Sequence, residues 1–134
     1  MSDPIDHVVQ QIKYQLLSRM GRKVEEASHL ELYQALAYAL REEVMRHWTA
    51  SSRSTAASKA RVTFYLSMEY LPGPMTHTNA VALGAQELLQ AALQRLGRRY
   101  QDVMAMEPDP GLGNGGLGRL ASCLLEGGAT HHYP

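Results

Sequence analysis

Hydrophobic residues near the N-terminus recur with the three- and four-residue spacing of an amphipathic helix. The apolar members of this run are Ile5, Val8, Val9, Ile12, Leu16, Leu17 and Met20. Asp3 and Pro4 come just before it, and these residue types cap and begin helices well. Gly21 follows as a stop signal. The pattern therefore predicts a first helix from Pro4 to Met20.

A capping box predicts the start of a second helix. In Ser28-His29-Leu30-Glu31, the Ser28 hydroxyl and the Glu31 carboxylate can each pair with a free backbone N–H group. The apolar side chains that follow on one face are Leu32, Leu36, Leu40, Val44 and Trp48. Residues 49–60 lose this period and are rich in side chains that compete for backbone hydrogen bonds. We predict that they form a surface loop.

The segment Val62–Leu66 is almost continuously apolar and rich in β-branched and aromatic residues. This composition is typical of a strand covered on both faces. Leu71-Pro72-Gly73-Pro74 then predicts a turn. A single strand would leave its backbone groups unpaired, and the chain stops where an α/β fold would add the next strand. We therefore expect an incomplete domain.

The helical period returns in the second half of the chain. It predicts a third helix over about 79–96, with Gly97 as its stop, a short helical turn within 101–107 and a further helix over 120–125. No internal repeat is present in the sequence. The predicted elements are thus mostly helices, with one core strand.

Composition narrows the possible partners and compartments. The 134 residues carry 13 Lys and Arg against 13 Asp and Glu, and 45% are hydrophobic. A balanced charge argues against nucleic-acid binding, and the apolar content argues against disorder. No apolar run is long enough to span a membrane, so we expect no membrane contact and a cytoplasmic location. Cys123 is the single cysteine and is expected to be buried, and the scattered histidines do not suggest a metal site.

Five of the eight residues in the segment 111–118 are glycine. Where such a loop opens a helix, its free N–H groups and the positive helix end favour a phosphate. The spacing also fits a dinucleotide fingerprint, but Glu107-Pro108-Asp109-Pro110 stands where that motif needs a strand. A Walker loop is excluded because no Lys-Ser or Lys-Thr follows the glycines. Simple tight packing of the loop remains an alternative.

Glu107-Pro-Asp-Pro-Gly-Leu-Gly-Asn-Gly-Gly-Leu-Gly-Arg-Leu-Ala-Ser-Cys123 closely resembles the signature of the α-glucan phosphorylases. This family includes the glycogen, starch and maltodextrin phosphorylases. Upstream, Val62–Leu71 with Gly73 resembles the family's first core strand and its turn. Leu32–Trp48 resembles the helix before that strand. The resemblance covers nearly the whole chain, in the same order.

The resemblance implies the N-terminal part of an α/β, GT-B-like phosphorylase. Residues 1–60 would form an N-terminal helical region and loop, and residues 61–134 would begin a truncated catalytic domain. Members of the family are homodimeric glycosyltransferases that use pyridoxal 5'-phosphate. They cleave α-1,4-glucan with phosphate and release glucose 1-phosphate. The other interpretation is a non-catalytic remnant or an interaction module from a truncated gene.

Matched positions assign roles within the glycine-rich segment. The resemblance implies cofactor binding by Gly115 and Gly116, and substrate binding by Asn114, Gly115 and Leu117. It implies no catalytic residue in this chain, because none of its three lysines, Lys13, Lys23 and Lys59, matches the family's cofactor lysine. We therefore expect the isolated chain to be inactive. Glu69 is expected to be a solvated or structural carboxylate, with a buried and paired carboxylate as the alternative. Arg19 is expected to lie on a solvated face, with a dimer contact or effector binding as the less favoured alternative.

Overall fold

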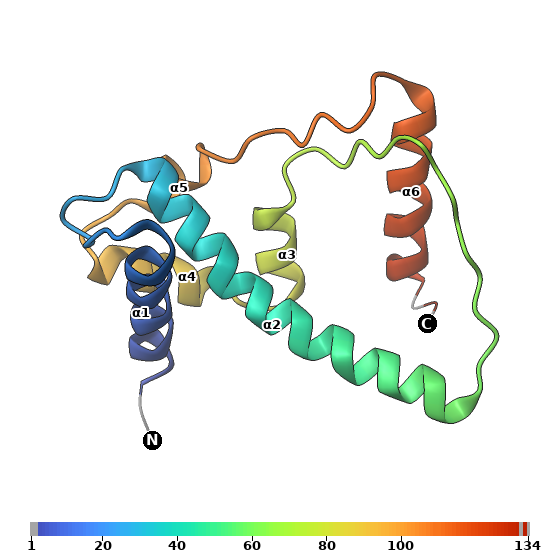
Figure 1. Ribbon diagram of the computed structural model, residues 1–134, viewed down its shortest axis with the longest axis horizontal. Coiled ribbons are helices and arrows are strands. Elements are labelled where there is room, and N and C mark those ends of the chain that lie inside the picture. Colours follow the sequence, from blue (N-terminus) through green and yellow to red (C-terminus); the bar gives the residue numbers. More distant parts are fainter. Residues whose placement is uncertain (1–2, 132, 134) are drawn as a thin grey trace. The chain divides into compact units, whose positions relative to one another are not determined.

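The computed structural model describes residues 3–131 and 133 (Figure 1). Its elements are α1 (Pro4–Gln15), a π-helix η1 (Leu16–Met20), α2 (His29–Ser58), α3 (Thr76–Ala82), α4 (Gln86–Arg95), α5 (Tyr100–Met104) and α6 (Gly116–Thr130). The described residues are mostly helical and contain no strand. None of these helices is both long and apolar enough to cross a membrane.

The chain divides into two compact units. The first unit comprises Met1–Val44 and Met75–Pro108, and the second comprises Met45–Pro74 and Asp109–Pro134. The first unit contains nearly all of the buried hydrophobic side chains of the described residues. The glycine-rich segment lies in the second unit.

The first helix begins as the sequence predicts, and its last turn is unusual. The Ile5 amide donates to the Asp3 carboxylate over 3.0 Å, so Asp3 is the N-cap. The chain then widens into the π-helix η1 before Gly21 ends it with a φ of 63°. Only a residue without a Cβ adopts this left-handed conformation at little cost. The sequence pattern did not predict the π-helix.

The capping box of α2 is confirmed. The Ser28 amide donates to the Glu31 carboxylate over 2.8 Å, and the Glu31 amide donates to the Ser28 hydroxyl over 3.2 Å. The predicted loop over 49–60 is wrong, because α2 continues to Ser58. Hydroxyl groups in this part of α2 donate hydrogen bonds to backbone carbonyls of the same helix instead of disrupting it. An example is the 2.8 Å bond from Thr49 Oγ1 to the Met45 carbonyl.

The prediction of a core strand over Val62–Leu66 is also wrong. This segment has no secondary structure, and Phe64 and Leu66 are 83% and 92% exposed. A strand requires a neighbouring strand that pairs with its backbone. Within the described residues, the β-type pairing is a single isolated bridge between Tyr70 and Leu112. The apolar residues therefore have no sheet to join.

The predicted helix over 79–96 is divided by Gly84. This glycine has a φ of 64°, and the Gly84 and Ala85 amides donate to the Val81 and Ala80 carbonyls. The paired bonds form the helix-ending arrangement in which glycine occupies the left-handed position. Gly97 ends α4 in the same way, as predicted. The short helix within 101–107 and the helix over 120–125 are confirmed by α5 and α6.

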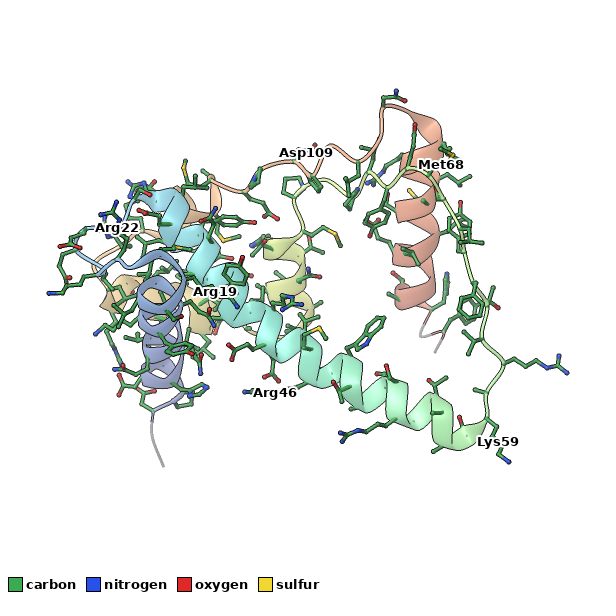
Figure 2. All side chains as sticks on the ribbon, in the orientation of Figure 1. Arg19, Arg22, Arg46, Lys59, Met68 and Asp109 are labelled. Carbon is green, nitrogen blue, oxygen red and sulfur yellow. The ribbon has the colours of Figure 1, made fainter. Side chains whose placement is uncertain are left out.

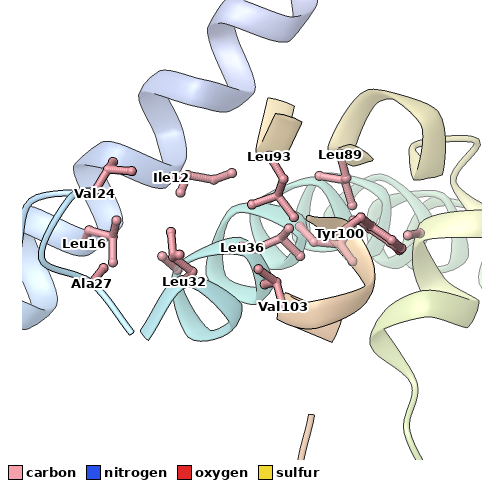
Figure 3. Packing of buried hydrophobic residues seen from close by; sticks show 13 residues of the cluster. Ile12, Leu16, Val24, Ala27, Leu32, Leu36, Leu89, Leu93, Tyr100 and Val103 are labelled. Carbon is pink, nitrogen blue, oxygen red and sulfur yellow. The ribbon is translucent and has the colours of Figure 1, made fainter. Parts of the chain in front are cut away.

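The core of the first unit lies among α1, α2, α4 and α5 (Figure 3). Its buried members are Ile12, Leu16, Val24, Ala27, Leu32, Ala35, Leu36, Leu40, Ala80, Leu89, Leu93, Tyr100 and Val103. Burial of this many aliphatic side chains is the main stabilising contribution to such a unit. In the second unit, Gly118, Ala121 and Ser122 are the buried residues of α6. Cys123, expected to be buried, is exposed.

Candidate functional site

The glycine-rich segment begins with a tight turn after α5. The Asp109 carboxylate accepts a hydrogen bond from the Gly111 amide over 2.9 Å. Gly111 has a φ of 61°, which a side chain would strain. An aspartate that bonds to the backbone two residues later is a common means of starting a turn. Asp109 and Gly111 thus fix the direction in which the loop begins.

The loop then packs closely against residues 69–71. The Tyr70 amide donates to the Leu112 carbonyl over 2.7 Å, and the Leu71 amide donates to the Gly118 carbonyl over 3.0 Å. A Cβ added at Gly113 would lie 2.9 Å from the Glu69 Cβ, which is closer than real side chains approach. A Cβ at Gly118 would lie 2.9 Å from the Leu71 Cγ. Tight packing therefore explains these two glycines.

Gly115 and Gly116 have a different environment. A Cβ added at either position would meet no atom of the described chain within 4 Å. Gly115 is the N-cap of α6, with extended backbone and no capping side chain, and Gly116 is the first helical residue. Packing within the chain therefore does not require glycine at these two positions. The open space beside them is available to a bound molecule.

The first turn of α6 presents hydrogen-bond donors. The Gly118 amide donates to the Glu69 carboxylate over 3.1 Å, so this acid stabilises the positive end of the helix. Glu69 is thus a structural carboxylate. The amides of Gly116 and Leu117 precede it in the first turn, where no intrahelical carbonyl is available to them. Two donors therefore remain for a negatively charged group.

Ser122 holds this helix start in place. It is fully buried, and its hydroxyl lies within hydrogen-bond distance of the Leu71 carbonyl, at 3.0 Å, and of the Arg119 carbonyl, at 2.9 Å. The Arg119 guanidinium also donates to the Leu71 carbonyl over 3.4 Å. Sequence reasoning missed this role of Ser122. A serine three residues after an arginine in the first turns of a helix is too common a pattern to reveal it.

The predicted site residues are neighbours in the chain and all are exposed. Asn114, Gly115, Gly116 and Leu117 follow one another from the loop into α6. Leu117 is 54% exposed although it is apolar. Among the described residues, no group of three or more His, Cys, Asp or Glu side chains could hold a metal ion. The three lysines, Lys13, Lys23 and Lys59, are exposed.

Comparison with known proteins shows what the chain is similar to. Residues 93–134 match the family model of the carbohydrate phosphorylases. The chain is 38% identical over 130 residues to the glycogen phosphorylase of Pasteurella multocida, covering 97% of this chain and 16% of that protein. It is 32% identical over 114 residues to the glycogen phosphorylase of Bacillus subtilis, covering 85% and 14%.

A plant relative shows the same relationship. Alpha-glucan phosphorylase 1 of Arabidopsis thaliana is 41% identical over 100 residues, which is 75% of this chain and 10% of that protein. The chain therefore spans a sixth or less of the length of these curated relatives. The family-model match includes the whole glycine-rich segment. This chain is homologous to the N-terminal region of the glycogen and α-glucan phosphorylases.

Proposed function

We propose that this chain supplies the phosphate-facing glycine loop of a pyridoxal 5'-phosphate-dependent α-1,4-glucan phosphorylase. The observation that carries the proposal is the contrast between two pairs of glycines. Gly113 and Gly118 are required by packing against residues 69–71, whereas Gly115 and Gly116 adjoin open space. The homology to glycogen phosphorylases supports the proposal. The proposed reaction is the one that the family resemblance implies, the cleavage of α-1,4-glucan by phosphate to release glucose 1-phosphate.

The chemistry of the loop suits a phosphate group. A phosphate dianion offers several strong acceptors, and the amides of Gly116 and Leu117 lie at the positive end of α6. Glycine at positions 115 and 116 allows a ligand to approach the backbone without meeting a Cβ. Glu69 accepts from the third amide of the turn, which fixes the helix start. The residues present therefore fit the phosphate end of the cofactor.

Within this proposal, each residue of the loop has a role. Gly115 and Gly116 hold the cofactor phosphate, and Asn114, Gly115 and Leu117 border the sugar or phosphate substrate. Pyridoxal 5'-phosphate, when bound, would supply a phosphate group that exchanges a proton with the substrate phosphate. This chain contributes neutral donors that orient the phosphate and stabilise its charge. The lysine that attaches the cofactor would come from another part of the enzyme.

The complete enzyme would have a GT-B-like α/β architecture. Residues 1–60 would form its N-terminal helical region, and residues 61–134 would begin its catalytic domain. Large hydrophobic side chains that this chain leaves exposed support a contact with further protein of the complete enzyme, since exposed apolar surface commonly marks such a contact. Those in the segment after α2 are Val62, Phe64, Tyr65, Leu66 and Met68. Pairing of two such enzymes into a homodimer is also part of the proposal.

A chimera tests the proposal. The 134-residue chain replaces the matching N-terminal segment of the Pasteurella multocida glycogen phosphorylase, to which it is 38% identical. We expect the chimera to release glucose 1-phosphate from glycogen and phosphate, and the isolated chain to release none. A folded chimera that binds pyridoxal 5'-phosphate but has no activity would contradict the proposed role. Activity of the isolated chain would contradict the view that it lacks catalytic residues.

A further inference from the structure

Glu107, near the end of the first unit, binds the start of α3. Its carboxylate accepts hydrogen bonds from the Met75 amide over 2.8 Å, from the Thr76 amide over 3.0 Å and from the Thr76 hydroxyl over 2.8 Å. The first amides of a helix have no intrahelical partner. Met75 is the N-cap of α3, and its own side chain makes no capping bond. A carboxylate 31 positions further along the chain therefore caps this helix.

Hydroxyl groups connect Glu107 to α2 as well. The single hydrogen of the Thr76 hydroxyl is donated to the Glu107 carboxylate, so the Tyr33 hydroxyl donates to Thr76 Oγ1 over 3.1 Å. Burial raises the pKa of Tyr33, and the negative charge of Glu107 raises it further. The phenol therefore keeps the proton that it donates. Because Thr76 is only 8% exposed, these bonds are shielded from water.

The hydrogen bonds of Glu107 join the two ends of one stretch of chain. In the first unit this stretch is Met75–Pro108, so Glu107 near its end binds residues at its start. The segments that continue from the two ends pair with each other in the second unit, where the Tyr70 amide donates to the Leu112 carbonyl over 2.7 Å. The same two segments are therefore paired within each unit.

The chain from Glu107 to the glycine-rich segment is stiff. The rings of Pro108 and Pro110 fix their φ angles. Between them, Asp109, which is labelled in Figure 2, accepts a hydrogen bond from the Gly111 amide over 2.9 Å. Each position from 107 to 111 is thus constrained by a ring, a hydrogen bond or a tight turn. A displacement of Glu107 would pass into the glycine-rich segment instead of being absorbed before it.

We propose that Glu107 is a positioning residue, which fixes the point from which the glycine-rich segment starts. That segment carries the Gly116 and Leu117 amides, so the consequence for activity rests on the proposed function. Glu107 acts through its bonds to Met75 and Thr76 and not through the substrate or the cofactor. Loss of its charge therefore displaces the phosphate-facing donors without removing them, and displacements of about 1 Å can lower a rate by roughly 100-fold.

Hydrogen exchange of the 134-residue chain tests this placement. Glu107→Gln keeps the size of the side chain, but its NH₂ group would face the Thr76 amide, which donates to both carboxylate oxygens. We expect the Tyr70 and Leu71 amides to exchange at least about tenfold faster, because the pairing of the two segments loosens. Glu87→Gln, an exposed acid in the first turn of α4, is the matched control and should leave these rates unchanged.

Two variants of Thr76 test the same connection with a smaller change. Thr76→Val keeps the branched shape and removes the hydroxyl that donates to Glu107, whereas Thr76→Ser keeps a hydroxyl. We expect the Tyr70 and Leu71 amides to exchange faster in Thr76→Val and at the wild-type rate in Thr76→Ser. Equal rates in these two variants would overturn the proposal, also where Glu107→Gln fails to fold.

A purely local role of Glu107 gives a different result. If this residue only caps α3, then Glu107→Gln speeds exchange of the Asn79 amide, which donates to the Met75 carbonyl at the start of that helix. The Tyr70 and Leu71 amides would then exchange as in the wild type. That combination in a folded chain would overturn the proposal.

The chimera with the Pasteurella multocida enzyme measures the consequence for activity. We expect Glu107→Gln to lower kcat at least about tenfold, with the KM for glycogen, the melting temperature and the bound pyridoxal 5'-phosphate close to those of the parent chimera. Glu87→Gln should keep the parent kcat. An unchanged kcat in Glu107→Gln would overturn the proposal. A folded parent chimera without activity would instead contradict the proposed function, and the exchange rates of the chain would still decide the role of Glu107.

Discussion

At the scale of single residues, the glycines of the loop have two different roles. Sequence comparison treats them as one motif, whereas the structure separates those that touch Glu69 and Leu71 from those beside open space. Gly113 and Gly118 could not be recognised as packing residues from the sequence, because their contacts lie more than forty positions upstream. The predicted residues Gly115 and Gly116 remain a proposal. Their open environment supports it.

Replacement of Gly113 by alanine should loosen the loop. The added Cβ would lie 2.9 Å from the Glu69 Cβ, and overpacking of this kind costs about 1–3 kcal/mol. Hydrogen exchange of the α6 amides measures the effect, which we expect to appear as faster exchange. Gly128→Ala is the matched control. Its Cβ meets nothing within 4 Å, and alanine favours the helix by about 1 kcal/mol, so exchange should slow. Equal exchange in Gly113→Ala and wild type would contradict the packing role.

The Glu31 carboxylate should make stability depend on acid pH. Hydrogen bonds from the Ser28 amide and hydroxyl, helped by Arg22, hold the pKa of Glu31 below its ordinary value of 4.5. The pKa of Glu31 is lower in the folded chain than in the unfolded chain. The charged carboxylate therefore stabilises the fold above pH 4.5, and this stabilisation is lost as the pH falls through the folded-state pKa.

Melting temperatures at pH 7 and pH 3 check this expectation. The wild type should melt higher than Glu31→Gln at pH 7, and the difference should shrink at pH 3. Glu25→Gln is the control, since its carboxylate has no hydrogen-bond partner in the described part of the chain. A difference between wild type and Glu31→Gln that stays constant with pH would refute the role of the charged cap.

At the scale of elements, capping signals predicted the starts of α1 and α2 correctly. Asp3 and the Ser28–Glu31 box act within a few residues, so the sequence alone contains their partners. The prediction of a strand over Val62–Leu66 was wrong because a strand needs neighbouring strands for its backbone hydrogen bonds. The described residues provide no such strand. The third helix was predicted as one element because its apolar period continues across Gly84. The left-handed φ of Gly84 ends α3 and so separates it from α4.

The two parts of α2 should differ in stability. All buried side chains of this helix, Leu32, Ala35, Leu36 and Leu40, lie in its first half. Most of the helical turns after Val44 carry exposed side chains, and Trp48 is 66% exposed. Backbone hydrogen bonds without buried contacts open readily. Hydrogen exchange should therefore be slow for amides at 36–40 and much faster at 49–57, and equal protection of both halves would disagree with the structure.

At the scale of the whole molecule, the sequence indicated the likeness to the phosphorylases. The structure showed which side chains contact one another. Resemblance along the segment 107–123 identified the phosphorylases, and the comparisons confirm it over most of the chain. The side-chain contacts of Arg19 were not predicted, because they depend on how η1 and α2 pack. Sequence reasoning placed Arg19 on a solvated face. Its contacts with Gln15 and Tyr38 appear only in three dimensions.

The central claim is that the backbone beside Gly115 and Gly116 receives a phosphate. The most direct test compares Gly116→Ala with Gly127→Ala in the chimera with the Pasteurella multocida enzyme, because neither new Cβ meets an atom of the described chain within 4 Å. We predict that Gly116→Ala lowers glucose 1-phosphate formation at least tenfold without lowering the melting temperature, while Gly127→Ala keeps full activity. Full activity in a folded Gly116→Ala chimera would contradict the claim.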